Sequence, residues 1–190
     1  MSLESRVNEL LAEGQYGEAA STAIRQLGPQ VLSYLAAILH SEADAHEVFS
    51  QFAEDLWKGL PGFRGESSLR GWAYRIAWHA SARFVRDPYR RRGRRLETTE
   101  ASRLAQEVFS ALAPEQSWRS QRVAQLRNML EPEEKALLIL RVDRALSWRE
   151  VALALADEGE APLSEVALRK RFERLKEKLG RAAKEQGLID

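Results

Sequence analysis

Residues 63–95 carry the pattern that most constrains how this chain folds: FRGESSLRGWAYRIAWHASARFVRDPYRRRGRR. Ten arginines against two acidic residues give the segment a net charge of +8, and six aromatic residues are interleaved with the charge. A loop is predicted to end at Ser67 or Ser68, either of which can cap a long helix that fades near Asp87-Pro88. This charge pattern differs from an ordinary solvated helix face, which mixes both signs.

Two interpretations of the segment remain open. Arginine neutralises phosphates and aromatic rings stack on unpaired bases, so the segment is typical of a surface for single-stranded or melting nucleic acid. However, Leu69, Trp72, Ala73 and Ile76 follow helical spacing, and an aromatic stripe at that spacing is more often core. About two thirds of these aromatic residues are therefore expected in the core.

The charge of the whole chain, +1, conceals a strong segregation along the sequence. Residues 1–62 carry −6 and residues 96–163 carry −4, whereas residues 164–184 carry +5. Together with the +8 segment, this pattern indicates two nucleic-acid contacts separated by acidic stretches, which are free to meet a protein partner.

Composition limits the function classes. The chain has 190 residues, 44% of them hydrophobic, and no cysteine, which excludes disulfides, thiolate metal sites and a cysteine nucleophile. We find no signal peptide and no apolar run long enough to span a bilayer, so a soluble cytoplasmic protein without membrane insertion is expected. Neither a phosphate-cradling glycine loop nor a nucleophile elbow is present, and an enzyme is not expected.

An all-α fold is predicted, because alternating β-branched runs are missing and Ala, Leu, Glu and Arg dominate. Gly28-Pro29 is interpreted as a helix stop and Pro61-Gly62 as a break. The predicted helices span about 4–13, 16–27, 30–40, 44–60, the basic segment from Ser67 or Ser68, 133–143, 147–156 and 164–184, with a further helical stretch from about Trp118 to a break at Glu131-Pro132. Residues 96–118 are interpreted as a linker with some helical content.

Residues 147–179 are typical of a helix-turn-helix. Ser147 caps a short helix, a turn follows, and Ser164 caps the helix SEVALRKRFERLKEKL. Its apolar residues are predicted to form one inward stripe, and its basic residues lie on the other faces; the stripe comprises Val166, Leu168, Phe172, Leu175 and Leu179. A recognition helix places such residues in the major groove, whereas the alternative is a solvated amphipathic helix.

Taken together, these motifs resemble the extracytoplasmic-function (ECF) sigma factors of the bacterial RNA polymerase sigma-70 family. The specific part is DLWKGLPGFRGESSLRGWAYRIAWHASARFVR, which is similar to the family's Phe-Arg-Gly-Glu/Asp-Ser loop and the Trp-x-Tyr-Arg-Ile-Ala helix that follows it. The segment LEPEEKALLILRVDRALSWREVALAL resembles the start of the family's second domain. The resemblance covers nearly the whole chain.

The resemblance implies a sigma factor with three contact surfaces. The loop and helix that would recognise and melt the −10 element carry Phe63, Arg64, Gly65, Glu66, Ser67, Trp72, Arg75, Trp78, His79 and Arg83. The helix that would read the −35 element carries Ser164, Arg169, Lys170, Arg171 and Arg174. The helix that would dock on core RNA polymerase carries Glu47, Ser50, Gln51, Glu54, Asp55 and Trp57.

The resemblance also implies the domain organisation and partners. Residues 1–95 would form sigma domain 2, residues 96–122 a linker and residues 123–190 sigma domain 4. Core RNA polymerase, promoter DNA and an anti-sigma factor are the expected partners, and no cofactor is expected. Three departures from the family are visible. The docking helix reads EVFSQFAED, in which only Glu47 clearly keeps the charge of the family's Asp…Gln-Glu pattern. His79 replaces the Asn of some members, and the turn ADEGEAPLSE is several residues longer than usual.

Three alternatives from other classes were weighed. His40, Asp44, His46 and Glu47 can be drawn as a metal cluster of an enzyme, but they are better explained as surface polar residues. A stand-alone helix-turn-helix regulator does not need the aromatic and basic segment, because a reader of duplex DNA melts nothing. An interaction protein that titrates another regulator would have negligible affinity for DNA.

Overall fold

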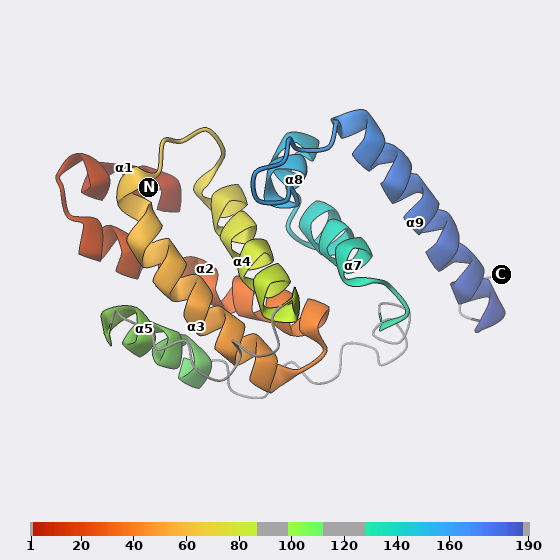
Figure 1. Ribbon diagram of the computed structural model, residues 1–190, viewed down its shortest axis with the longest axis horizontal. Helices are drawn as coiled ribbons and strands as arrows, with labels where there is room; N and C mark the ends of the chain where they lie inside the picture. The colour runs from red at the N-terminus through yellow and green to blue at the C-terminus, as the bar shows by residue number, and fades with distance from the viewer. Residues whose placement is uncertain (1, 87–98, 112–127, 188–190) are drawn as a thin grey trace. The chain divides into compact units, whose positions relative to one another are not determined.

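A computed structural model describes residues 2–86, 99–111 and 128–187 (Figure 1). Every regular element in these ranges is a helix, which confirms the predicted all-α fold. The chain divides into two compact units, Met1–Ala113 and Pro114–Asp190, which we describe separately as the first and second unit.

The first unit is a small helical bundle. Its elements are α1 (Leu3–Ala12), α2 (Tyr16–Leu39), α3 (Glu42–Gly59), the short 3₁₀ helix η1 (Leu60–Gly62), α4 (Leu69–Arg86) and α5 (Thr99–Ala111). Helices α2, α3 and α4 pack on one another, and α1 covers α2. In the core, the rings of Tyr34 on α2 and Tyr74 on α4 meet edge to face, with centroids 5.2 Å apart.

The predicted helix stop at Gly28-Pro29 is wrong, because α2 runs unbroken from Tyr16 to Leu39. A proline inside a helix removes one backbone hydrogen bond and costs about 3 kcal/mol. Burial of apolar residues on both sides of the Gly28-Pro29 pair offsets that cost. Ile24 and Leu27 precede the pair, Val31 follows it, and all three are at most 3% exposed. Tertiary packing therefore overrides the local signal.

Gly28 serves close packing rather than helix termination. A Cβ atom built at this position would lie 2.9 Å from Cγ2 of Val108 on α5 and 3.1 Å from Cζ of Phe49 on α3. Val108 of α5 and Phe49 of α3 thus pack closely against α2 where it lacks a side chain.

Gly28→Ala is expected to lower the free energy of unfolding by about 1–3 kcal/mol, because the added methyl overpacks the core. Gly180→Ala is the matched control: Gly180 also lies inside a helix, but its Cβ would meet nothing within 4 Å. That control is expected to stabilise by about 0.5–1 kcal/mol through helix propensity alone. Urea unfolding followed by circular dichroism measures both changes, and an increase in stability for Gly28→Ala would contradict the packing argument.

Residues 99–111, which the sequence analysis placed in the linker, form α5 and pack against α2 and α3 within the first unit (Figure 1). The rings of Phe109 on α5 and His46 on α3 stack with centroids 4.1 Å apart. At the rim, the Arg25 guanidinium donates a 2.8 Å hydrogen bond to the Glu107 carboxylate. The predicted helix end near Asp87-Pro88 and residues 118–127 of the predicted helical stretch lie outside the described residues.

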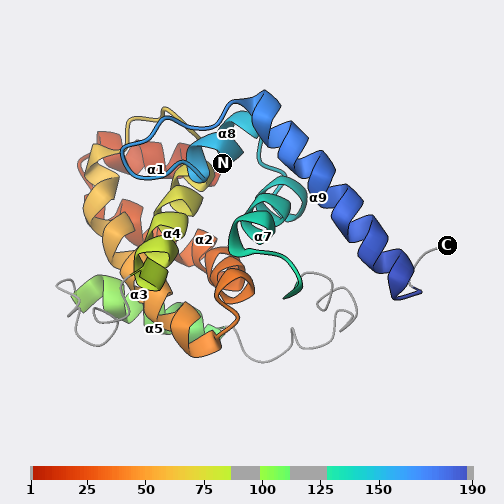
Figure 2. The same cartoon turned by 45° about the vertical axis from the view of Figure 1, so that its right-hand side comes forward.

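The second unit contains α7 (Pro132–Leu138), the wide turn η3 (Ile139–Asp143), α8 (Trp148–Ala154) and α9 (Glu165–Glu185). Both predicted caps are confirmed: Ser147 Oγ accepts from the Glu150 N–H at 3.2 Å, and Ser164 Oγ accepts from the Ala167 N–H at 3.2 Å. Helix α9 packs against α8 and α7, as both views show (Figures 1 and 2). Lys135 is buried in this unit, and burial lowers the pKa of its ammonium group.

Candidate nucleic-acid interface

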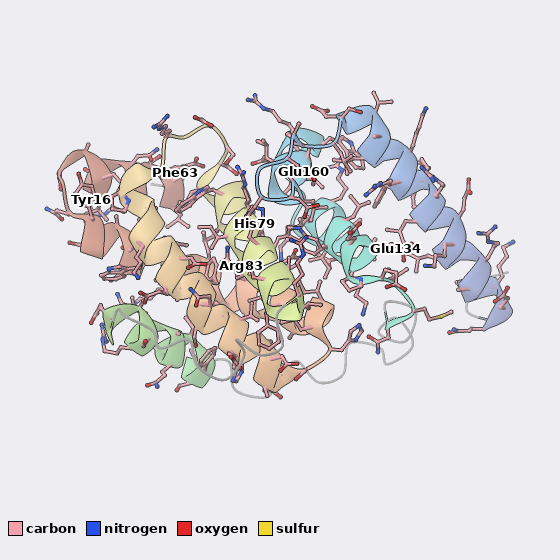
Figure 3. All side chains as sticks on the ribbon, viewed as in Figure 1. Tyr16, Phe63, His79, Arg83, Glu134 and Glu160 are labelled. Carbon is pink, nitrogen blue, oxygen red and sulfur yellow. The ribbon has the colours of Figure 1, made fainter. Side chains whose placement is uncertain are left out.

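The loop before α4 presents an exposed edge next to an aromatic pair. Arg64, Gly65 and Glu66 are exposed, and Gly65 takes the left-handed backbone conformation (φ +69°) that favours glycine. Behind them, the half-buried ring of Phe63 packs on Trp72, with ring centroids 5.1 Å apart (Figure 3). The exposed residues Arg64 and Glu66 therefore follow directly in sequence on a half-buried aromatic residue, whose ring is tilted by 44° against that of Trp72.

Local contacts hold this loop at the start of α4. Of the two serines predicted as caps, Ser68 performs the role, since its Oγ accepts from the Gly71 N–H at 3.0 Å. Ser67 is half-buried beside it, and its hydroxyl donates to the Ser68 carbonyl oxygen at 3.3 Å. The Leu69 N–H donates to the Glu4 carboxylate at 3.2 Å, so α1 also anchors the beginning of α4.

The residues of α4 that were predicted to contact the −10 element differ in accessibility. Trp72, Arg75, His79 and Arg83 are half-buried and keep part of their side chains accessible. Trp78 is 8% exposed, and its indole Nε1 finds no hydrogen-bond acceptor among the described residues. Trp78 thus lies with the core residues of the first unit and not with its accessible ones.

A groove of about 450 Å³ lies between α3 and α4, lined by Asp55, Lys58, Gly59, Ile76, His79 and Arg83. Asp55 accepts from the Arg83 guanidinium, and Gln51 donates to the same carboxylate at 2.6 Å. Asp55, predicted for polymerase docking, therefore pairs with Arg83, predicted for the −10 element, and Gln51 holds the Asp55 carboxylate from the same helix. Figure 3 labels His79 and Arg83 on this part of α4.

The remaining residues predicted for polymerase docking differ in accessibility. Glu47 is exposed, whereas Glu54 is 3% exposed and pairs with Lys58 at 3.0 Å. Ser50 donates to the backbone carbonyl of His46 at 3.0 Å, and Trp57 packs over Gly17 of α2. Of the six predicted side chains, only Glu47 falls in the fully exposed class.

The alternative metal cluster gains no geometric support. His46 stacks on Phe109, and across residues 2–86, 99–111 and 128–187 no three His, Cys, Asp or Glu side chains gather as metal ligands would. In the same ranges, no helix is long and apolar enough to cross a membrane.

An aromatic pair joins the two helices of the predicted helix-turn-helix, α8 and α9, and two cations lie over one of its rings. The rings of Trp148 on α8 and Phe172 on α9 meet edge to face at 5.5 Å. The guanidinium groups of Arg141 and Arg169 lie over the Trp148 ring, at 4.9 and 5.4 Å from its centroid. The sequence analysis did not single out Trp148 or Arg141, although a tryptophan directly after the Ser147 cap was a usable signal.

The basic residues predicted for the −35 element are exposed on α9, but their partners differ. Arg169 pairs with Glu165 at 3.5 Å within the helix, and Arg171 pairs with Glu133 of α7 at 3.7 Å. Arg174 donates to the carbonyl of Lys170 at 3.3 Å. Ser164 is exposed, and its hydroxyl oxygen is engaged as the helix cap.

A second contact joins α9 to α7 two turns farther along the helix. The Lys178 ammonium donates to the Glu134 carboxylate at 2.7 Å. Partial burial acts to raise the pKa of the Glu134 carboxyl, but hydrogen bonds from Lys178 and from the Glu131 backbone outweigh it, so the net pKa lies below its ordinary value. This side of α9 therefore faces its own unit.

Comparison with known proteins identifies the family to which the chain is similar. Residues 23–95 match the Sigma-70 region 2 family, a range that includes α3, the loop at 63–68 and α4. The chain is also 30% identical over 135 residues to the RNA polymerase sigma factor YlaC of Bacillus subtilis (strain 168), an alignment that covers 67% of this chain and 74% of that protein.

The chain belongs to the sigma-70 family, as an ECF sigma factor. It is accordingly a sigma factor that directs transcription initiation, and the resemblance drawn from the sequence is confirmed. Sigma factors are in general not enzymes.

Proposed function

We propose that this sigma factor binds core RNA polymerase through α3, melts the −10 element with the loop at 63–67 and α4, and reads the −35 element with α9. The observation that carries the proposal is the Phe63–Trp72 pair beside exposed Arg64 and Glu66 at the start of α4. An apolar ring surface next to a cation suits an unpaired base and its phosphate.

For the −10 element, the accessible contacts in this proposal are the loop from Phe63 to Ser67 together with Trp72, Arg75, His79 and Arg83. Trp78, which is buried, supports the helix from inside and contributes to the element only through that support. Base capture then depends on the loop, and phosphate contacts depend on the arginines of α4.

For polymerase docking, the proposal rests on Glu47, the exposed acid of the predicted set. Asp55 is engaged with both Arg83 and Gln51, while Glu54 is engaged with Lys58. These pairs fix the α3 surface around Glu47. For the −35 element, the proposed contacts are Arg169, Lys170, Arg171 and Arg174, with Ser164 setting the start of the helix.

Further parts of the proposal follow from family membership. We place the protein in the cytoplasm, without catalytic activity of its own, and we assign it an anti-sigma factor as inhibitory partner. The anti-sigma assignment is tested by adding the purified candidate inhibitor to transcription reactions. Inhibition that excess sigma factor relieves supports the assignment, and unchanged transcription at excess inhibitor contradicts it.

The deciding experiment for the main proposal is size-exclusion chromatography of the purified protein with bacterial core RNA polymerase. Stoichiometric co-elution is expected. Absence of co-elution, combined with salt-sensitive binding to duplex DNA alone, would instead favour a stand-alone helix-turn-helix regulator.

Glu47→Lys is expected to weaken polymerase binding by about tenfold, because it reverses the sign of an exposed charge at the proposed interface. Glu13→Lys, at an exposed acid at the end of α1, is the matched control and is expected to bind normally. Titration of labelled sigma factor with core polymerase measures both affinities. Equal affinities for the two variants would remove Glu47 from the docking surface.

A further inference from the structure

The outward side of α9 contains one apolar residue that its packing does not explain. Leu168 and Leu175 lie on the packed side and are 1% and 2% exposed, as expected for the inward stripe of an amphipathic helix. The prediction that Val166 belongs to this stripe is wrong, because Val166 lies on the opposite side by helical spacing and is 62% exposed. A single exposed valine is common on protein surfaces, so its neighbours decide what it means.

Those neighbours favour the first two turns of α9 as the part that contacts base edges. Arg169 and Lys170 follow Val166 by one turn and are exposed. Farther along the same side stand two exposed acids, Glu173 and Glu177. Phosphates would be repelled by these carboxylates, although Lys176 partly neutralises Glu173 at 2.7 Å.

The flank of α9 toward α7 is already occupied. Lys178 pairs with Glu134, and Arg171, although exposed, pairs with Glu133 at 3.7 Å, so both cations also contact α7. The outward residues near the beginning of the helix are therefore Val166, Arg169 and Lys170. Recognition helices place the residues of this N-terminal part against base edges.

We propose that Val166 is a specificity-determining residue that contacts the C5-methyl group of one thymine in the −35 element. Thymine presents a methyl group in the major groove, and an apolar side chain is the partner that matches it. Arg169 and Lys170, one turn on, supply the flanking polar and phosphate contacts. This inference rests on the proposed role of α9 at the −35 element.

The test uses the complete protein with core RNA polymerase. Because the promoter is unidentified, the probe is first selected from a duplex library in which the upstream element is randomised. Each thymine of the selected element is then replaced by deoxyuridine, which removes only the methyl group. One replacement is expected to weaken binding of the wild-type holoenzyme by about three- to fourfold, the value for one apolar carbon.

Val166→Ala is expected to bind the thymine duplex as weakly as the wild type binds the uridine duplex, and to be insensitive to the replacement. Val166→Thr keeps one γ-methyl group and is expected to retain part of the sensitivity. Val142→Ala is the matched control, because Val142 is a valine of the same unit, 54% exposed, that lies in η3. That control is expected to lose as much affinity as the wild type when thymine is replaced by deoxyuridine.

Each outcome supports or overturns the inference. Loss of the thymine preference in Val166→Ala alone supports it. Equal sensitivity in wild type and Val166→Ala, or no sensitivity at any thymine, overturns it while leaving the proposed function intact. If no upstream sequence is enriched although the −10 element is melted, the −35 assignment of α9 fails, and the inference fails with it.

Discussion

Phe63→Ala is expected to prevent promoter melting while leaving the protein folded and bound to core RNA polymerase. The Phe63 ring is half-buried against Trp72 at the beginning of α4. Its removal therefore exposes the Trp72 ring further without opening the core. Stacking of a base on an aromatic ring contributes about 1–3 kcal/mol. Loss of one such contact therefore reduces the population of open complex by roughly 5- to 150-fold.

Permanganate reactivity of thymines in the −10 region measures the open complex, and chromatography with core polymerase measures binding separately. Tyr16→Ala is the matched control, since Tyr16 is an aromatic residue of the same unit that is 48% exposed and lies on α2. Normal permanganate reactivity in Phe63→Ala would show that the loop does not capture the melted base. Equal loss in Tyr16→Ala would point to general destabilisation.

Trp78→Ala is expected to lower the free energy of unfolding of the first unit by about 3–5 kcal/mol, the range for truncating a buried large aromatic residue. Only 8% of this side chain is exposed, and it lies on the same helix as the fully buried Tyr74. Any loss of melting activity in this variant is consequently a loss of folded protein. Urea unfolding followed by tryptophan fluorescence and circular dichroism measures the change.

Trp78→Phe separates packing from DNA contact. It keeps most of the buried apolar volume, so stability and promoter melting are both expected to return largely to the wild-type level. A variant with wild-type stability and no melting would instead assign Trp78 a direct contact with the −10 element, as the resemblance implied.

Local signals in the sequence correctly predicted helix starts and ends where no tertiary contact competes with them. Ser147 and Ser164 cap the helices that they were predicted to cap, and Pro61-Gly62 ends α3 in a 3₁₀ turn. Gly28-Pro29 was misinterpreted because it has the local features of a helix stop, while burial on both sides of the pair keeps α2 continuous. No short window of sequence contains that information.

The accessibility of the candidate site residues was harder to predict than their position. Trp72 and Trp78 lie on the same helix, in the same aromatic and basic segment, yet one is half-buried beside the loop and the other lies in the core. Likewise, the sequence predicts Asp55 as an acid available for docking, whereas in the structure Asp55 on α3 pairs with Arg83 on α4. Partners that are distant in sequence determine these outcomes.

The packing of α5 has a consequence for biosynthesis. Arg25 and Glu107 pair across 82 residues of chain, and Val108 lies against Gly28 over a similar separation. At a translation rate of about 5–20 residues per second, the partner of α2 emerges from the ribosome roughly 4–16 s after α2 itself. Until then, the α2–α3 surface at Gly28 and Phe49 stays uncovered and open to chaperones. In a recombinant fragment that ends at residue 95, the α2–α3 surface would stay uncovered permanently. A fragment that ends at Ala113 would include α5, which covers this surface.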